Sequence, residues 1–214
     1  MNAFRIPSLI RVTIIAALSA LAFGLAAHQE RGPVEIVQET TDKLFRIVDD
    51  NRDKYQNDAQ ALRKDIRDVL LAEIDTLYSG RLVLGRSARG MEPEKVGEFA
   101  DALSELLISR YADGLLGFRT RNQVEVRPLA GDNTERMTRV RTRVTLDNGD
   151  QAPVDYVFRK TDDDGWKIFD VIVEGISYVT TFRNQIGEQI RQEGFDATLE
   201  KLQRGEIEID VDEQ

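Results

Sequence analysis

Apolar residues recur at helical spacing in the first half of the chain and alternate with polar residues further on. The helical segments before the change of pattern are residues 33–50, 59–78 and 93–116. The alternating segments, typical of strands, are residues 124–129, 137–146, 152–160 and 166–174. Helical spacing then returns over residues 176–193 and 195–203. This order predicts an α+β fold, with a meander antiparallel sheet and N- and C-terminal helices over an apolar interior.

Short polar turns join the predicted strands. Asn148-Gly149 is typical of a hairpin turn, and three acidic residues before Gly165 indicate a turn that faces water. The chain has no internal repeat and no low-complexity linker. We therefore expect one domain over residues 27–204, followed by an acidic tail over residues 205–214.

The first 26 residues have the layout of an export signal. Arg5 and Arg11 precede an apolar run that starts at Val12, no acidic residue interrupts it, and small residues follow. We expect a signal peptide over residues 1–26, cut after Ala26. Its removal takes the formal net charge from −9 to −11. An uncleaved anchor is the alternative, although the run of roughly 16 apolar residues is shorter than the about 20 that span a bilayer.

Composition excludes several classes of protein. The 214 residues include no cysteine, so disulfides and thiol chemistry are impossible. His28 is the sole histidine, which leaves little scope for histidine catalysis or metal binding. An excess of nine acidic charges argues against nucleic acid as a partner. We expect no metal site, no cofactor and no catalytic residue.

The segment 166–174 is apolar on both of its faces. By alternation, Ile168 and Ile172 share one face, and Phe169, Val171 and Val173 share the other. A strand buried on both sides needs apolar cover on each side. Helices packed closely on the sheet would provide it, and so would helices held apart around a cavity for an apolar ligand. The pattern leaves both interpretations open.

Three arginines alternate with apolar or small residues on one predicted strand. Arg139, Arg141 and Arg143 therefore share a face. A face in water is the simpler interpretation. A cationic patch for an anionic headgroup or an acidic partner is the alternative.

The segment WKIFDVIVEGISYVTTFRNQ, residues 166–185, resembles the signature of the MlaC family, also called the Ttg2 toluene-tolerance family. The residues that match the family pattern there and beyond are Trp166, Lys167, Asp170, Val171, Glu174, Gly175, Ser177, Arg183, Gln185, Gly194 and Leu199. Residues 83–85 and 106–115 are also similar to family segments. Thr181-Phe182 stands where the family has Asn-Tyr, and Ile186 where it has Phe.

The resemblance implies an NTF2-like fold and a periplasmic phospholipid carrier. Such a carrier holds the acyl chains of a glycerophospholipid in a deep apolar cavity. It exchanges lipid with an inner-membrane ABC transporter that has an MCE domain and with an outer-membrane lipoprotein-porin complex, and so maintains outer-membrane lipid asymmetry. Under this interpretation, the residues expected to line the tails are Phe99, Leu103, Leu107, Tyr111, Val144, Val157, Phe169, Val171, Val173, Val179 and Phe182.

The shared motif also has an architectural interpretation. Gly175 would let the chain turn where a Cβ obstructs, Ser177 would cap a helix, and Glu174 would pair with Arg183.

An enzyme of the same fold is a rival hypothesis: an isomerase or dehydratase with Asp170 as base and Tyr156 as acid. Alternation puts Asp170 on the face of Trp166 and Ile168, with no second acid beside it. An adaptor protein held by an uncleaved signal is a third hypothesis.

Overall fold

The computed structural model describes residues 30–117, 123–127, 129, 133–146 and 148–208. The chain divides into two units, Met1–Glu30 and Arg31–Gln214, and only the second is described below. The predicted signal peptide lies outside the described residues. None of the helices within those residues combines the length and the hydropathy that crossing a membrane requires.

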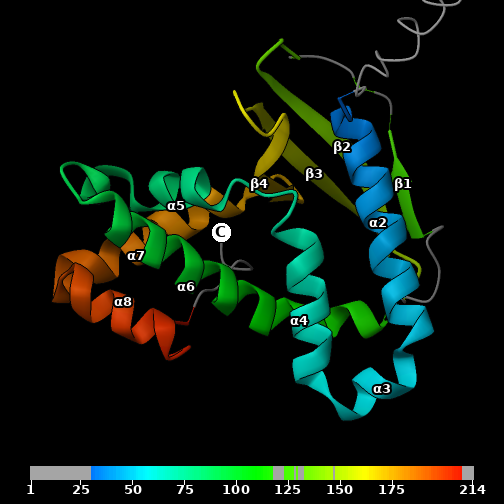
Figure 1. Ribbon diagram of the computed structural model, residues 1–214, viewed down its shortest axis with the longest axis horizontal. Helices are drawn as coiled ribbons and strands as arrows, with labels where there is room; N and C mark the ends of the chain where they lie inside the picture. The colour runs from blue at the N-terminus through cyan, green and yellow to red at the C-terminus, as the bar shows by residue number, and fades with distance from the viewer. Residues whose placement is uncertain (1–29, 118–122, 128, 130–132, 147, 209–214) are drawn as a thin grey trace, which may run out of the picture. The chain divides into compact units, whose positions relative to one another are not determined.

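Helices precede and follow a single sheet, as predicted (Figure 1). The helices are α2 (Pro33–Asp50), α3 (Arg52–Asn57), α4 (Ala59–Leu70), α5 (Thr76–Leu84), α6 (Pro93–Tyr111), α7 (Tyr178–Glu193) and α8 (Phe195–Gln203), with short 3-10 turns η1 (Gly85–Ala88) and η2 (Ala112–Gly117). The strands are β1 (Val124–Val126), β2 (Met137–Thr145), β3 (Gln151–Lys160), β4 (Trp166–Val173) and β5 (Ile176–Ser177). Neighbouring strands pair antiparallel in the order β1-β2-β3-β4-β5, which confirms the α+β meander.

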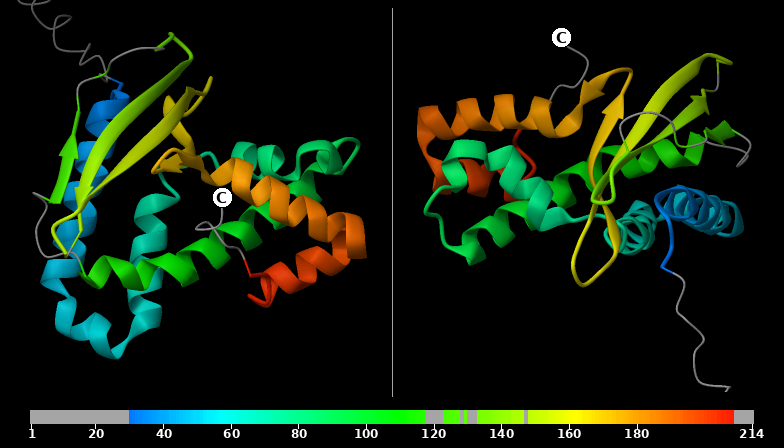
Figure 2. Two further views of the ribbon diagram at one scale, coloured as in Figure 1. Left: turned by 180° about the vertical axis from the view of Figure 1, so that it is seen from behind. Right: turned by 90° about the horizontal axis from the view of Figure 1, so that it is seen from above.

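Helix α2 covers one face of the sheet (Figures 1 and 2). Pro33 occupies its first turn, where the missing N–H has no intrahelical partner to lose. Ile36 and Val37 are buried against Val140 of β2 and Phe158 of β3. On the opposite face, the alternate residues of β2 are exposed.

Helices α5, α6, α7 and α8 form a second layer beside β4 (Figure 2). Phe99 of α6 and Phe182 of α7 are central to their shared core. Ile207, in the segment expected to be an acidic tail, is 2% exposed and belongs to this core. The chain is therefore packed against the helices at least as far as that residue.

The prediction of one continuous helix over residues 59–78 is wrong, because α4 and α5 occupy the segment with a break between them. After α4, Ile74 forms a parallel bridge with Ile168 of β4. The N–H of Ile168 donates to the Glu73 carbonyl and the N–H of Asp75 donates to the Ile168 carbonyl, each over 2.8 Å. The break satisfies backbone groups at the edge of β4, and Asp75 then caps α5 by accepting from the N–H of Tyr78.

Close packing of α5 on α6 explains the presence of a glycine, Gly80, inside α5. A Cβ at Gly80 would come within 2.8 Å of the Ala100 Cβ. The two helices can approach this closely only because Gly80 has no side chain.

A β-bulge in β4 corrects the predicted facing of its residues. Asp170 is opposite Val157 of β3, and Ile168 is opposite the next residue, Phe158. Phe169 is therefore the extra residue of the bulge, and the alternation changes phase there. Asp170 does not share the face of Ile168, as alternation alone had predicted.

The turn after β4 also differs from expectation. Val173 pairs with Ile176, so Glu174 and Gly175 form a two-residue hairpin turn into β5. Both have positive φ, 51° and 89°. A Cβ at Gly175 would meet nothing within 4 Å, so the turn requires glycine for its φ and not for space.

Candidate functional site

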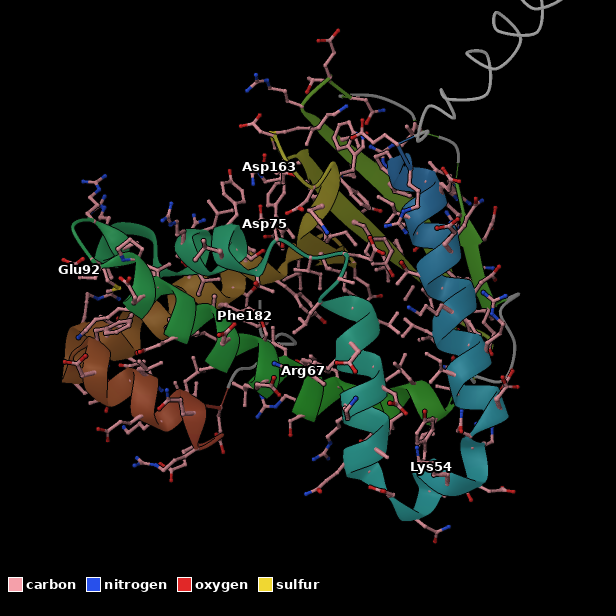
Figure 3. All side chains as sticks on the ribbon, in the orientation of Figure 1. Lys54, Arg67, Asp75, Glu92, Asp163 and Phe182 are labelled. Carbon is pink, nitrogen blue, oxygen red and sulfur yellow. The ribbon has the colours of Figure 1, made fainter. Side chains whose placement is uncertain are left out.

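A cavity of about 310 Å³ lies where α4, α5, α6 and α7 meet β4. Ile66 and Leu70 belong to its α4 side, Leu107 to its α6 side and Val179 to its α7 side. Phe182, labelled in Figure 3, projects from α7 into the core that α7 shares with α6. The cavity therefore has walls from segments that the sequence separates by more than 100 residues.

Seven of the eleven residues expected to line lipid tails lie in this wall. They are Leu103, Leu107, Tyr111, Phe169, Val171, Val179 and Phe182. The bulge at Phe169 explains why four consecutive residues, 168–171, reach one cavity, which a regular strand would not allow.

The other four expected residues lie elsewhere. Phe99 is fully buried in the helical core, with its ring 6.3 Å from that of Phe195. Val144 lines a second, smaller cavity. Val157 and Val173 line neither cavity.

Sequence reasoning missed the wall that α4, α5 and the segment between them supply. Its members are Ile66, Leu70, Leu71, Ile74, Thr76, Ser79, Gly80 and Val83. Their helical spacing was visible, but the pattern of one segment does not show which distant segment it faces. Tyr178, at the first turn of α7, was missed as well.

Three polar side chains in the cavity wall, those of Ser79, Ser104 and Asp170, are hydrogen-bonded within the protein. Ser79 Oγ donates to the Phe169 carbonyl and Ser104 Oγ donates to the Ala100 carbonyl, each over 2.8 Å. The Asp170 carboxylate accepts from Ser177 Oγ over 2.6 Å and from the N–H of Val179 over 3.0 Å. The wall thus presents mostly apolar surface, which suits a hydrocarbon ligand.

Three aromatic rings follow one another along the cavity. The ring centroids of Tyr111 and Tyr178 are 6.3 Å apart, and those of Tyr178 and Phe182 are 5.5 Å apart. Tyr111 is 39% exposed, so this end of the row reaches water. A tyrosine at such a boundary has an apolar ring and a polar tip, as at membrane interfaces.

A second aromatic contact braces the bulge. Tyr78 of α5 meets Phe169 edge to face at 5.3 Å, and the guanidinium of Arg159 lies 4.4 Å from the centre of the Tyr78 ring. Arg159 also pairs with Asp75, which is labelled in Figure 3. These contacts join β3, β4 and α5 at one edge of the cavity.

Asp170 and Tyr156, the base and acid of the enzyme hypothesis, do not line the same cavity. Asp170 lines the first cavity and Tyr156 lines the second. Burial raises the pKa of the Tyr156 phenol, which favours its neutral form. The Asp170 carboxylate holds the start of α7, and Ser177 caps that helix as predicted by accepting from the N–H of Thr180 over 3.1 Å.

The expected pairing of Arg183 with Glu174 is wrong. Arg183 donates instead from Nε to the Leu82 carbonyl at the end of α5.

Arg139, Arg141 and Arg143 lie on the exposed face of β2. Arg139 pairs there with Asp155 at 3.4 Å. No cluster of three or more metal-binding side chains occurs within the described residues, and His28 lies outside them.

Known proteins resemble the chain in sequence and in fold. The family model described as "MlaC protein" matches residues 38–204. The intermembrane phospholipid transport system binding protein MlaC of Haemophilus influenzae is 29% identical over 87% of this chain and 88% of its own length. Toluene tolerance protein ttg2D of Pseudomonas putida is 27% identical over 82% of this chain and 80% of its own length.

A solved structure has the same fold. A phospholipid-binding protein from Ralstonia solanacearum, solved in complex with a phospholipid, superposes with a TM-score of 0.70. It is 22% identical, and the alignment covers 79% of this chain and 94% of that one. The family match covers more than half of the sequence and includes both the sheet and the helices that enclose the cavity. This chain therefore belongs to the MlaC family.

Proposed function

We propose that the protein is a periplasmic phospholipid carrier that holds acyl chains in the cavity between β4 and the helices. The observation that carries this proposal is an apolar cavity of about 310 Å³ in whose wall Ser79, Ser104 and Asp170 are hydrogen-bonded to the protein itself. Such a wall offers dispersion contacts and excludes water. The Haemophilus and Pseudomonas relatives, named for phospholipid transport and toluene tolerance, support the same function.

The free energy of acyl-chain hydration explains why a carrier is needed. A diacyl lipid has roughly 30 methylenes, and each gains about 0.8 kcal/mol on leaving water, so a free lipid in water costs on the order of 20 kcal/mol. A cavity that resembles the membrane interior makes exchange between membrane and carrier nearly neutral. The protein therefore needs no chemical step, because shielding the chains is sufficient for transport.

The headgroup would stay near water at the Tyr111 end of the aromatic row. Tyr111 is exposed, while Phe182 at the other end is 2% exposed. An acyl chain entering beside Tyr111 would pass Tyr178 before it reached Phe182. This order keeps the polar part of the lipid outside and the hydrocarbon inside.

Two membrane complexes would exchange lipid with this carrier: an inner-membrane ABC transporter with an MCE domain and an outer-membrane lipoprotein-porin complex. A cleaved signal peptide over residues 1–26 would place the protein between them. The resulting transport would maintain the lipid asymmetry of the outer membrane.

Filling the cavity tests the proposal. Leu107→Trp adds bulk to the wall, while Leu77→Trp makes the same change at a residue of α5 that is 42% exposed and does not line the cavity. We expect Leu107→Trp to reduce transfer of a fluorescent phospholipid between vesicles at least tenfold and Leu77→Trp to leave it unchanged. Equal transfer by both variants, with native circular dichroism, would count against the cavity as the lipid site.

A further inference from the structure

The fold contains a second apolar cavity, of about 120 Å³, which η2 also lines through Leu115. It lies between α2 and the face of the sheet that α2 covers. Leu44 and Val48 of α2 line it together with Val144 of β2 and Tyr156 of β3. Its lining is apolar apart from two hydroxyl-bearing residues, Thr41 and Tyr156.

Leu115 is the one residue that lines both cavities within the described part of the chain. It packs against one buried cluster that includes Val48, Leu62 and Ile108. The two spaces therefore meet at a single leucine side chain.

Leu115 lies in η2, a 3-10 turn of six residues, which is longer than the three or four that this geometry usually sustains.

The backbone around Leu115 is tied in place on both sides. Arg52 donates from Nη1 to the Leu116 carbonyl over 2.6 Å, and Arg63 pairs with Asp113 at 3.0 Å. The tethers hold η2 against α3 and α4, whereas the Leu115 side chain packs through apolar contacts alone. Rotation about its side-chain bonds requires no movement of this tethered backbone.

We propose that Leu115 is a gate, and that the second cavity takes the methyl end of an acyl chain whose first part lies in the main cavity. This inference rests on the proposed phospholipid carriage. An apolar cavity of about 150 Å³ holds benzene, so the main cavity has room for about a dozen carbons. A longer chain needs further apolar space, and the second cavity is the space that adjoins it.

The gate makes the preferred chain length depend on Leu115. When a chain moves from membrane to carrier, each methylene that stays buried is nearly neutral in free energy. Each methylene left in water lowers the amount of that lipid bound to the carrier about fourfold. With the second cavity open, chains of about 12 and about 16 carbons load comparably, and with it closed the longer chain is disfavoured.

Competition between two lysophosphatidylglycerols, each with a single acyl chain, tests the gate. The wild-type protein and the variants are incubated with vesicles that contain equal amounts of the two lipids, with acyl chains of about 12 and about 16 carbons. The bound lipids are then identified by mass spectrometry. Leu115→Trp closes the passage, and Val144→Phe fills the second cavity from β2, at a residue that does not line the main cavity. Leu77→Trp is the control for an added indole.

We expect both blocking variants to load lipid with the ratio of long to short chains at least fourfold below that of the wild type, and the control to match the wild type. An unchanged ratio in either folded variant would overturn the gate while leaving the carrier proposal intact. A wild-type protein that loads neither of the two lipids would overturn the gate, and one that also fails to load a diacyl phosphatidylglycerol would overturn the carrier proposal. If Leu115→Trp fails to fold, Val144→Phe alone decides the result, because it reaches the second cavity from a different element.

Discussion

The carboxylate of Asp170 accepts a hydrogen bond from Ser177 Oγ over 2.6 Å across the β4–β5 hairpin. Its other oxygen accepts from the N–H of Val179, in the first turn of α7. One side chain thus fixes the start of α7 to β4, and both elements supply wall to the cavity.

Removing this carboxylate should destabilise the fold. We expect Asp170→Ala to lower the free energy of unfolding by about 1–3 kcal/mol, because the N–H of Val179 and Ser177 Oγ lose their partner. Urea denaturation measures the loss. Asp155→Ala is the control, since Asp155 pairs with exposed arginines and should cost at most about 1 kcal/mol. Equal losses in both variants would contradict the role given to Asp170.

Two glycines allow a matched test of helix packing. A methyl group at Gly80 would meet the Ala100 Cβ at 2.8 Å, so Gly80→Ala should lower stability by about 1–3 kcal/mol. Gly97 is also in a helix, and a Cβ there would meet nothing within 4 Å. Gly97→Ala should therefore raise stability by about 0.5–1 kcal/mol. Thermal unfolding of both variants measures the two changes in stability. A gain of stability in Gly80→Ala would refute the close approach of α5 and α6.

These outcomes show what the hydrophobic pattern could and could not predict. The bounds of α2 and α8 follow from apolar spacing and from the flanking Pro33 and Gly194. The break at Ile74 does not follow from the pattern. Ile74 bridges a strand, yet it stands at the spacing of an apolar residue in a helix. Only the tertiary contact with Ile168 distinguishes the two.

The site was predictable to a similar degree. Residues of α6 and α7 were found because each helix has one apolar side, and most of those chosen line the cavity. The facing of β4 was not predictable, since the extra residue at Phe169 changes the phase of alternation without any signal in composition. Phe99 was misplaced because a wide apolar side of α6 faces both the cavity and the packed core.

A substitution at Glu174 should raise the stability of the turn between β4 and β5. Glu174 has φ of 51°, a left-handed conformation that asparagine adopts at lower cost in hairpin turns. Its side chain is exposed. We predict that Glu174→Asn raises the free energy of unfolding by about 0.5–1 kcal/mol without changing bound lipid. A loss of stability in urea would show that the Glu174 side chain makes a contribution greater than the backbone strain.

Alkaline pH provides a test of the α3–α4 contact. Burial and a hydrogen bond of 2.7 Å to Asp65 raise the pKa of Tyr55 to about 12. A phenol whose pKa is higher in the folded than in the unfolded chain stabilises the fold below about pH 10, and this contribution disappears as pH rises towards 12.

The comparison with Tyr55→Phe isolates this effect from other alkaline titrations. At neutral pH the variant should be less stable by about 1 kcal/mol, because it lacks the hydrogen bond to Asp65. Between pH 10 and about 12 the wild-type advantage should shrink, as the phenol ionises in the unfolded chain. A difference in unfolding free energy that stays constant over this range would contradict the raised pKa.

The most direct measurement is native mass spectrometry of the protein purified without detergent. We predict a bound mass that matches one or more diacyl phospholipids, verified by extraction and fragmentation, and its loss in Leu107→Trp. A folded wild-type protein that carries no lipid, even after incubation with phospholipid vesicles, would contradict the conclusion that the cavity between β4 and the helices holds acyl chains.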